Sequence, residues 1–515
     1  MGNPFQLLAF CFFPILHLSI RPMRKFKFPS AYTTLYIIII ISALATWLMP
    51  AGSYDTLSYT DGEFIVEGSR SATLPGTQHT LDSLGLQMEL SKFEEGKIRR
   101  PVSIPDTYQE LEPSPQGLKA ILYAPIKGIY ESIDIILFVL IIGGFIGVFQ
   151  SSGALEKGVG FLSEKLKGRE KWLIILTMLL IALGGTTFGM QEETIAFYPT
   201  LVPIFIAAGY DLLVPVAAVY IGSCIGLIGA TVNPFSTIIA SDAAGVSWTV
   251  GFYSRLIMLF ITAIVSIAYV VRYAERVKVD PTRSLLHGLE IKNPFEKKAV
   301  EAPGPMKPVT WFLLILFGLT FLVMVYGVSV LGWWFEEMTA LFLAAAIIIG
   351  VLQRISESNF GIAFVNGAKE LLGVSLIIGI ARGITIIMNE GKISGTILNE
   401  ASDLVSGTSS LIFLPVLMVV FFVLAFFISS SSGLALVSMP IMGALGNVVG
   451  VPSEEIVNAY LFGFGMMQLF TPSGLVLPSL AMVNVPYNIW VKFNLKLVLI
   501  IALIGGAVLI LGYLL

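Results

Sequence analysis

The sequence predicts an all-α polytopic membrane protein with an inverted repeat, in which each half carries a re-entrant helical hairpin and a discontinuous helix. Its 515 residues are 56% hydrophobic and 13% charged, whereas soluble domains are about 45–50% apolar and about 25% charged. Several apolar runs approach the roughly 17–25 residues that a helix needs to cross a bilayer. Similar interrupted segments also recur about 240 residues apart in the two halves of the chain.

The first 30 residues are predicted to be a cytoplasmic extension, with Met1 or Met23 as the starting residue. Basic residues in short loops mark the cytoplasmic side of a membrane protein. The stretch RPMRKFKFP before the first apolar run is basic, which places the N-terminus inside. Residues 31–131 should then hold the first span and an external segment, because residues 51–118 contain 11 acidic and five basic residues. We assign residues 31–131 to the scaffold and expect the external segment to be a solvated loop that packs over it.

The first repeat is predicted at residues 132–272, with a hairpin at 184–208 and a broken helix at 214–241. The segment ALEKGVGFLSEKLKGREK, which precedes the hairpin, has five basic and three acidic residues and should lie inside. Residues 273–308 are hydrophilic and basic on balance, which is typical of a cytoplasmic linker.

Residues 309–365 are predicted to be scaffold helices, and residues 366–515 the second repeat. This repeat should contain a hairpin at 409–445 and a broken helix at 456–482. Its segment EGKISGTILNEASDLVSGTS has one basic and three acidic residues, which places it outside. Because the matching segment of the first repeat is inside, the two repeats should be inverted and the C-terminus should be external.

Three pairs of segments indicate the repeat. LIIGGFIGVFQSSG matches LIIGIARGITIIMNEG, TTFGMQEETIAFYP matches ISSSSGLALVSMP, and YIGSCIGLIGATVNPFST matches YLFGFGMMQLFTPSGLVLPS. Irregular backbone at membrane depth is tolerated only where it is buried in protein or lines a water-filled cavity. Interrupted segments at matching places of two inverted halves mark a transport site. The pattern therefore predicts a secondary transporter whose hairpin tips meet near the middle of the membrane.

Several stretches also resemble YfcC-like members of the C4-dicarboxylate anaerobic carrier (DcuC) family, most specifically GMQEE and NPF within FGMQEETIAFYPTLVPIFIAAGYD and TVNPFSTIIASDAAGVS. The resemblance covers nearly all of the chain from Met23. It implies membership of the ion transporter superfamily, an elevator-type mechanism, a homodimer and a bacterial cytoplasmic membrane. The family name refers to C4-dicarboxylates, whereas YfcC-like members are described as basic amino acid antiporters.

Charged residues within the apolar segments are the first candidates for the site. Glu192 and Glu193 are adjacent, and an ionisable residue in a span costs roughly 2.5–3.5 kcal/mol and is usually functional. Capping of a helix N-terminus would return only about 0.3–1 kcal/mol. These energies favour a functional role. Because adjacent residues of a helix point about 100° apart, we predict that at most one of them faces the substrate while the other packs against the scaffold or a backbone N–H of the tip. Arg382 should lie deep, where it either pairs with one of these glutamates or binds a substrate carboxylate in a bidentate manner.

Neutral polar residues at the tips and breaks complete the predicted site. The further substrate-binding candidates are Asn233, Ser431, Ser432, Gly433, Thr471 and Ser473. The oxygen donors expected near a coupling Na⁺ are Thr187, Thr231, Asn233, Ser236, Ser430, Thr471 and Ser473. Such oxygens suit both cations and the hydrogen bonding of a carboxylate, and any one of them could instead cap a broken helix. H⁺ is the alternative coupling ion, and no other cofactor is expected.

The charges favour a basic amino acid as substrate, in arginine/ornithine-type exchange or ion-coupled transport. Such a molecule needs an anion site for its carboxylate and acidic partners for its amines, which fits Arg382 with Glu192 and Glu193. A C4-dicarboxylate such as succinate or fumarate, coupled to Na⁺ or H⁺, is the alternative. The sequence contains no HExxH motif, so an intramembrane metalloenzyme is not expected. Flux without saturation would indicate a channel, and the bilayer, not nucleic acid, is the expected partner.

Overall fold

The computed structural model describes residues 30–514 except 69–70, 95–97, 99–100, 155–156, 159–160, 162–167, 293–306, 332 and 407–408. Nearly all of the predicted N-terminal extension, and parts of the predicted inside loop and linker, lie outside these residues. The described chain is mostly helical. Six of its helices are long and apolar enough to cross a membrane: α1 (Ala31–Leu48), α5 (Ile133–Gln150), α12 (Phe252–Val279), α14 (Phe335–Leu352), α15 (Glu357–Glu390) and α21 (Tyr487–Leu514).

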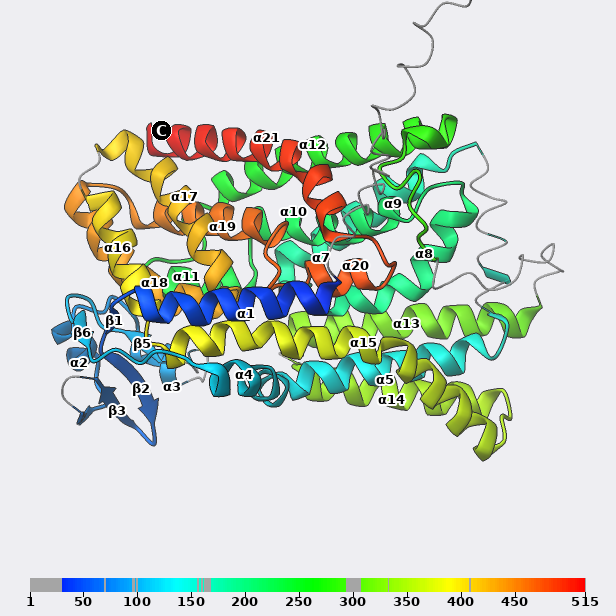
Figure 1. The fold of residues 1–515 in the computed structure, drawn as a ribbon, viewed down its shortest axis with the longest axis horizontal. Helices are drawn as coiled ribbons and strands as arrows, with labels where there is room; N and C mark the ends of the chain where they lie inside the picture. Colours follow the sequence, from blue (N-terminus) through cyan, green and yellow to red (C-terminus); the bar gives the residue numbers. More distant parts are fainter. Residues whose placement is uncertain are drawn as a thin grey trace, which may run out of the picture.

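One layer of helices, which we call the lower layer, lies along the lower side of Figure 1. It holds α1, α5, α14 and α15 together with α4 (Leu118–Glu131) and α13 (Pro308–Leu331). The 34-residue helix α15 is its central member and packs against α1, α4 and α5. Ser30 and Ser356 cap α1 and α15, because each serine side chain accepts a backbone N–H three residues later.

The upper layer contains two similar series of elements (Figure 1). Each series has an 18-residue helix, a returning helical segment, a broken helix and a final helix of 28 residues. The first series is α7 (Lys171–Phe188), η1 (Glu192–Phe197), α8 (Tyr198–Ala207), α9 (Leu213–Val216), η2 (Ala217–Ile221), α10 (Gly222–Ile228), η3 (Pro234–Ile238), α11 (Ile239–Ala243) and α12. The second is α17 (Ser410–Phe427), α18 (Ser431–Val449), α19 (Ser453–Gln468), α20 (Val476–Ala481) and α21.

The first hairpin, formed by α7 and α8, begins at Lys171 and so earlier in the chain than the segment predicted at 184–208. In Figure 1, α8 lies at one end of the molecule, whereas α17 and α18 lie at the other with α16 (Ser394–Ser406). The short η4 (Pro281–Arg283) follows α12.

The all-α prediction is wrong for the segment between α1 and α4, which we call the β region. It forms a two-stranded sheet in the order β1-β6 and a four-stranded sheet in the order β4-β3-β2-β5. The elements are β1 (Ala51–Ser53), β2 (Thr56–Thr60), β3 (Glu63–Glu67), β4 (Ala72–Pro75), α2 (Gln78–Ser83), α3 (Leu90–Glu94), β5 (Val102–Ser103) and β6 (Gln109–Leu111).

A tight hairpin explains why this segment folds. Strands β2 and β3 pair antiparallel, with Thr60 opposite Glu63, and the two residues between them have positive φ of 52° at Asp61 and 86° at Gly62. An Asp-Gly pair between strands favours this type of turn. Leu57 and Phe64 are fully buried beneath the sheet. The many acidic residues of this segment therefore led to the prediction of a loop, whereas the chain forms strands that enclose a small hydrophobic core.

The β region contacts helices far away in the sequence. Tyr54 donates a hydrogen bond to Asn399 Oδ1 at 3.2 Å, and Tyr108 lies 3.1 Å from the hydroxyl of Thr396, both on α16. Lys92 forms an ion pair with Asp242 of α11, with 3.3 Å between Nζ and Oδ1. It is a folded cap on one end of the helices and not a solvated loop.

Glycine permits close contacts between helices of the lower layer. A Cβ placed on Gly143 of α5 would lie 2.7 Å from the carbonyl oxygen of Gly367 on α15.

We predict that Gly143→Val destabilises the protein, by at least the roughly 1–3 kcal/mol typical of overpacking, because the backbone must move. Gly361→Val is the matched control, since nothing lies within 4 Å of its Cβ position. Thermal unfolding in detergent measures both, and equal midpoints would contradict the prediction.

Candidate functional site

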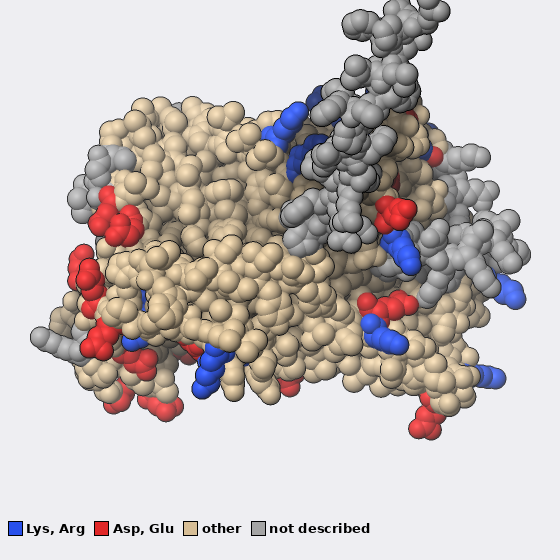
Figure 2. All heavy atoms as spheres, viewed as in Figure 1, with Lys and Arg blue, Asp and Glu red and all other residues tan. Residues whose placement is uncertain are grey.

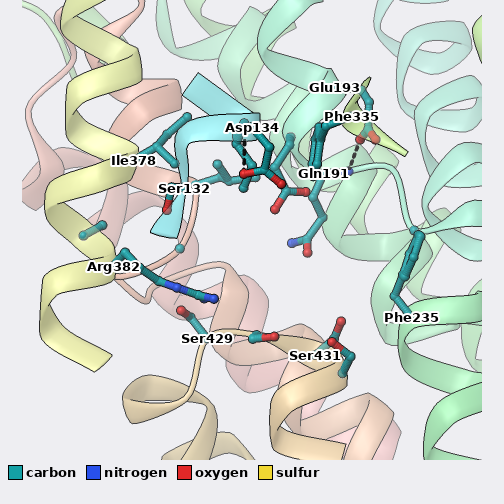
Figure 3. A pocket seen from close by; sticks show the side chains of 18 of the residues that line it. Ser132, Asp134, Gln191, Glu193, Phe235, Phe335, Ile378, Arg382, Ser429 and Ser431 are labelled. Carbon is teal, nitrogen blue, oxygen red and sulfur yellow. Dashed lines mark hydrogen bonds between the residues drawn. The ribbon is translucent and has the colours of Figure 1, made fainter. Parts of the chain in front are cut away.

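A polar cavity of about 220 Å³ lies where both hairpin tips meet the lower layer (Figure 3). Its wall includes the tip of each hairpin, the two breaks in the broken helices, the junction of α4 with α5, the turn between α13 and α14, and the middle of α15. Segments from both series of the upper layer and from the lower layer therefore share one cavity.

The first hairpin tip brings Glu192 and Glu193 to this cavity. Helix α7 ends at Phe188 and is capped by Gly189, whose φ of 75° is in the left-handed region that favours glycine. The chain then enters the 3₁₀ helix η1 at Glu192. Glu193 is 7% exposed, and its Oε2 accepts the backbone N–H of Gln191 at 3.1 Å. The backbone of the tip thus holds the Glu193 side chain.

Arg382 points into the cavity from α15, toward Ser429 in Figure 3. Its Nε lies 3.4 Å from Oε2 of Glu131, the last residue of α4. The predicted alternative of an ion pair with Glu192 or Glu193 is therefore not what the structure shows. The contact with Glu131 involves Nε only, and both side chains are partly exposed, so the pair contributes little to stability.

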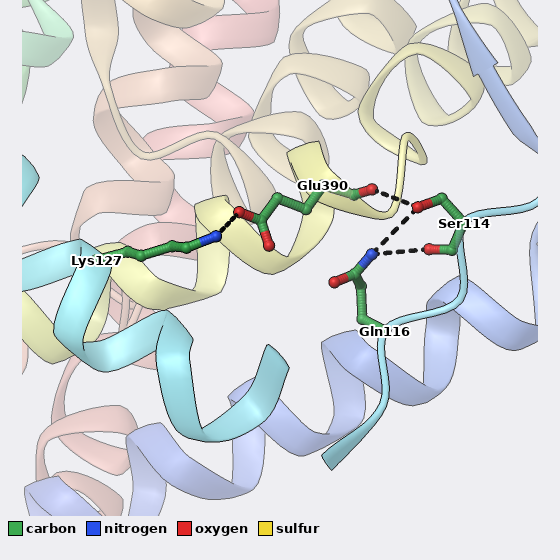
Figure 4. A network of polar contacts seen from close by, with 4 residues as sticks. All are labelled: Ser114, Gln116, Lys127 and Glu390. Carbon is green, nitrogen blue, oxygen red and sulfur yellow. Dashed lines mark hydrogen bonds and ion pairs between the residues drawn. The ribbon is translucent and has the colours of Figure 1, made fainter. Parts of the chain in front are cut away.

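The contact of Arg382 with Glu131 is one of two ion pairs between α4 and α15. One turn earlier on α4, Lys127 forms an ion pair with Glu390 of α15 (Figure 4). The backbone oxygen of Glu390 accepts a hydrogen bond from Ser114 at 2.9 Å, and Gln116 donates to Ser114 (Figure 4). The order of charges is reversed between the two pairs, with the basic residue on α4 in one and on α15 in the other.

The second hairpin tip contributes a row of hydroxyl groups. Residues 429–432 are all serines and line the cavity, and α18 begins at Ser431, so its first N–H groups lie at the wall. The Ser430 hydroxyl accepts the N–H of Gly433 at 3.2 Å. Gly433 itself is not part of the wall.

Other predicted residues tie the tips to the broken helices instead of lining the cavity. Asn233 caps η3, because its Oδ1 accepts the N–H groups of Phe235 at 2.9 Å and Ser236 at 3.2 Å. Its Nδ2 donates to Gly185 of α7 at 3.2 Å. Thr231 lies 3.0 Å from the hydroxyl of Thr186 in the same hairpin.

The second series repeats this arrangement. The hydroxyls of Thr471 and Ser473 lie 2.7 Å apart, and Ser473 donates to the carbonyl of Phe426 in α17 at 3.2 Å. Ser429 donates to the carbonyl of Ser473 at 3.3 Å. Of these residues, Ser429 and Ser473 also line the cavity, whereas Thr471 does not.

The proposed Na⁺ donors do not all line the cavity. Only Ser430 and Ser473 of that set line the cavity. Thr187 is exposed and donates to the carbonyl of Leu183 in its own helix at 2.6 Å. In the part of the chain that the structure describes, no group of three His, Cys, Asp or Glu residues is arranged to hold a metal ion.

The sequence analysis missed two parts of the wall. Glu131, Ser132 and Asp134 stand at the junction of α4 and α5, because a helix precedes the predicted span with only Ser132 between them. The apolar stretch LKAILYAPIKGIY before Glu131 was the available signal. Trp333, Trp334 and Phe335 lie at the turn between α13 and α14, where no pattern in the sequence distinguished them from scaffold residues.

The cavity wall carries more carboxyl groups than basic groups. The carboxylates of Glu131, Asp134, Glu192 and Glu193 share its wall with a single guanidinium, that of Arg382. Charged residues grouped around a cavity within apolar helices mark a pathway for a polar solute. The fold and the site thus define a polytopic membrane protein of the solute transporter class.

The chain belongs to the C4-dicarboxylate anaerobic carrier (DcuC) family, which it matches over residues 28–514. This match confirms the resemblance found in the sequence. An uncharacterized protein of Haemophilus influenzae is 40% identical over 499 residues, covering 95% of this chain and 98% of the relative. The Escherichia coli protein named "Putative basic amino acid antiporter YfcC" is 26% identical over 511 residues, covering 95% of this chain and 97% of that relative.

A solved structure also aligns with the chain. The Alcanivorax borkumensis YdaH transporter covers 93% of this chain and 98% of its own, with a TM-score of 0.38 and 13% identity. A likeness at this level supports no conclusion about the fold or the substrate.

Asn233 gives a direct test of how the first break is held. We predict that Asn233→Ala lowers stability by about 1–3 kcal/mol, because it removes a cap and leaves buried backbone groups without partners. Asn366→Ala is the control, since Asn366 is exposed on α15. Thermal unfolding in detergent compares the two variants, and an unchanged midpoint for Asn233→Ala would show that the cap is dispensable.

Proposed function

We propose that the protein is a secondary active transporter of basic amino acids, with arginine and ornithine as representative substrates in exchange or ion-coupled transport. The main support for this proposal is that the cavity wall has four carboxylates and one guanidinium. An anionic dicarboxylate would meet mainly like charge there, whereas a cation would be attracted. The name of the Escherichia coli relative agrees with this choice.

The arrangement of the charges suits an amino acid in particular. In Figure 3 the Arg382 guanidinium lies beside Ser429, whereas Asp134 and Glu193 lie on another side of the cavity. Arg382 and the serine tip would bind the α-carboxylate, because a guanidinium and hydroxyl donors match its oxygens. Glu192 and Asp134 would bind the cationic groups. Arg382 could exchange its single contact with Glu131 for the substrate without losing a strong ion pair.

The two-layer architecture supports an elevator mechanism as part of this proposal. The two hairpins and broken helices would form the moving domain, drawn from residues 132–272 and 366–515, and the lower layer would supply the fixed scaffold. Helices α5 and α15 pack together with α4 in the lower layer, so we assign them to the scaffold. The loop charges support a bacterial cytoplasmic membrane with the N-terminus inside and the C-terminus outside. We include a homodimer, joined through the lower layer, in the same proposal.

Transport of a C4-dicarboxylate, coupled to Na⁺ or H⁺, is the second candidate. It is favoured by the family's description and by the serine-rich tip at the start of α18, beside Arg382. Helix N-termini and guanidinium groups are the usual partners of carboxylates. A single guanidinium would have to serve both ends of such a substrate, which makes it the weaker candidate.

Proteoliposomes loaded with unlabelled arginine test the function directly. We expect uptake of labelled arginine that saturates and is competed by ornithine but not by succinate, with parallel measurements under Na⁺ and pH gradients to identify the coupling ion. Glu192→Gln should weaken arginine binding about tenfold to a hundredfold, because a hydrogen bond to a charged group contributes roughly 1.5–3 kcal/mol.

The control for this variant is Glu290→Gln, which neutralises an exposed carboxylate that is not part of the cavity wall. Succinate uptake that arginine does not inhibit would replace the first candidate by the second. Arginine uptake that remains unchanged in Glu192→Gln, Glu193→Gln and Arg382→Ala would show that the substrate binds elsewhere.

A further inference from the structure

Aromatic side chains form one side of the charged cavity. Phe235 comes from the first break in the upper layer, and Trp334 and Phe335 come from the turn between α13 and α14 in the lower layer. The ring centroids of Phe235 and Trp334 are 4.9 Å apart, and those of Trp334 and Phe335 are 5.3 Å apart, both in edge-to-face geometry. The three rings are therefore one continuous cluster across the two layers.

Two observations place Phe235 at the cavity wall. Its N–H is bound by Asn233, which caps η3, so the residue is held where the broken helix restarts. The ring also lies against the first hairpin tip, because a Cβ on Gly189 would be 3.0 Å from Phe235 Cδ2. Phe235 thus has little freedom to leave the cavity.

Trp334 is also held by its backbone, yet its side chain is accessible. Its N–H donates to the Glu337 carboxylate at 2.9 Å, which caps α14. The residue is nonetheless 47% exposed, whereas the neighbouring Phe335 is 7% exposed. A fixed, exposed indole at the wall of a polar cavity is available to a ligand.

The cluster lies away from the predicted carboxylate site. In Figure 3 the Phe235 ring and the Arg382 guanidinium are on opposite sides of the cavity, with Gln191 and Ser431 between them. A substrate whose carboxylate binds at Arg382 would therefore direct its far end toward Phe235. An aromatic ring attracts a cation through its face, and the carboxylates elsewhere on the cavity wall attract it through their charge.

We propose that Phe235 and Trp334 determine specificity by binding the far end of the substrate as a planar guanidinium, so that arginine is preferred over lysine. This inference rests on the proposed function. A guanidinium is planar and weakly hydrated and stacks on aromatic faces, whereas an ammonium is a compact, strongly hydrated charge. Carboxylates alone would attract both cations, so the aromatic cluster supplies the difference between them.

Calorimetric binding of arginine, lysine and the uncharged analogue citrulline to the purified full-length protein tests this inference. We expect the wild type to bind arginine more tightly than lysine and citrulline weakest. Phe235→Leu should weaken arginine binding about tenfold and lysine binding less than about twofold, so that the preference is largely lost. Phe235→Tyr should retain the preference because it keeps the aromatic face.

Phe260→Leu is the matched control, because Phe260 is 60% exposed on α12 and is not part of the cavity wall. If Phe235→Leu does not fold, Trp334→Leu at the more exposed position gives the same measurement. Equal weakening of arginine and lysine, or no change in either, would overturn the inference while leaving the proposed function intact. Absence of arginine binding to the wild type would instead overturn the proposed function, and this inference with it.

Discussion

The structure depends on the need to satisfy backbone groups wherever a helix stops inside the apolar bundle. A free N–H or C=O group at that depth costs several kcal/mol, since no water or lipid group replaces its partner. The protein meets this requirement with short polar side chains: Asn233 and Thr186 at the first break, and Ser473 at the second. Each bonds to backbone of a neighbouring segment, so hairpin and broken helix hold each other. The cavity exists because these contacts keep both tips in place.

The sequence predicted the features that follow from composition and from interruptions in apolar runs. Membrane helices, hairpin tips and breaks can be recognised from the residue types in the sequence. Glu192, Glu193 and Arg382 were identified because charged residues are rare within apolar segments. The structure places all three around one cavity. The partner of Arg382 could not be predicted, because Glu131 is 251 residues away and only the packing of α4 on α15 brings it near.

Other residues of the site could not be predicted, because residues of the same types also end membrane spans and cap helices elsewhere. In the sequence, Glu131 and Asp134 resemble the polar end of a membrane span, because α4, the helix that precedes this span, was not predicted. Asn233, Thr231 and Thr471 were predicted to bind substrate or Na⁺. In the structure the side chains of Asn233 and Thr231 bond to backbone groups, and none of the three residues is part of the cavity wall. The β region was concealed by its acidic composition, although its Asp-Gly turn was present in the sequence.

The β region has a mechanical consequence for the two layers. It is covalently joined to α1 and α4 of the lower layer, while Lys92 pairs with Asp242 of α11 and Tyr54 bonds to Asn399 of α16. Sliding of one layer along the other would have to break these contacts or draw the sheets along. The Lys92 and Asp242 side chains are 22% and 9% exposed, so salt would weaken their attraction only in part. In the elevator mechanism that we propose, the cap would resist movement between the layers, at the end of the molecule farthest from α8 in Figure 1.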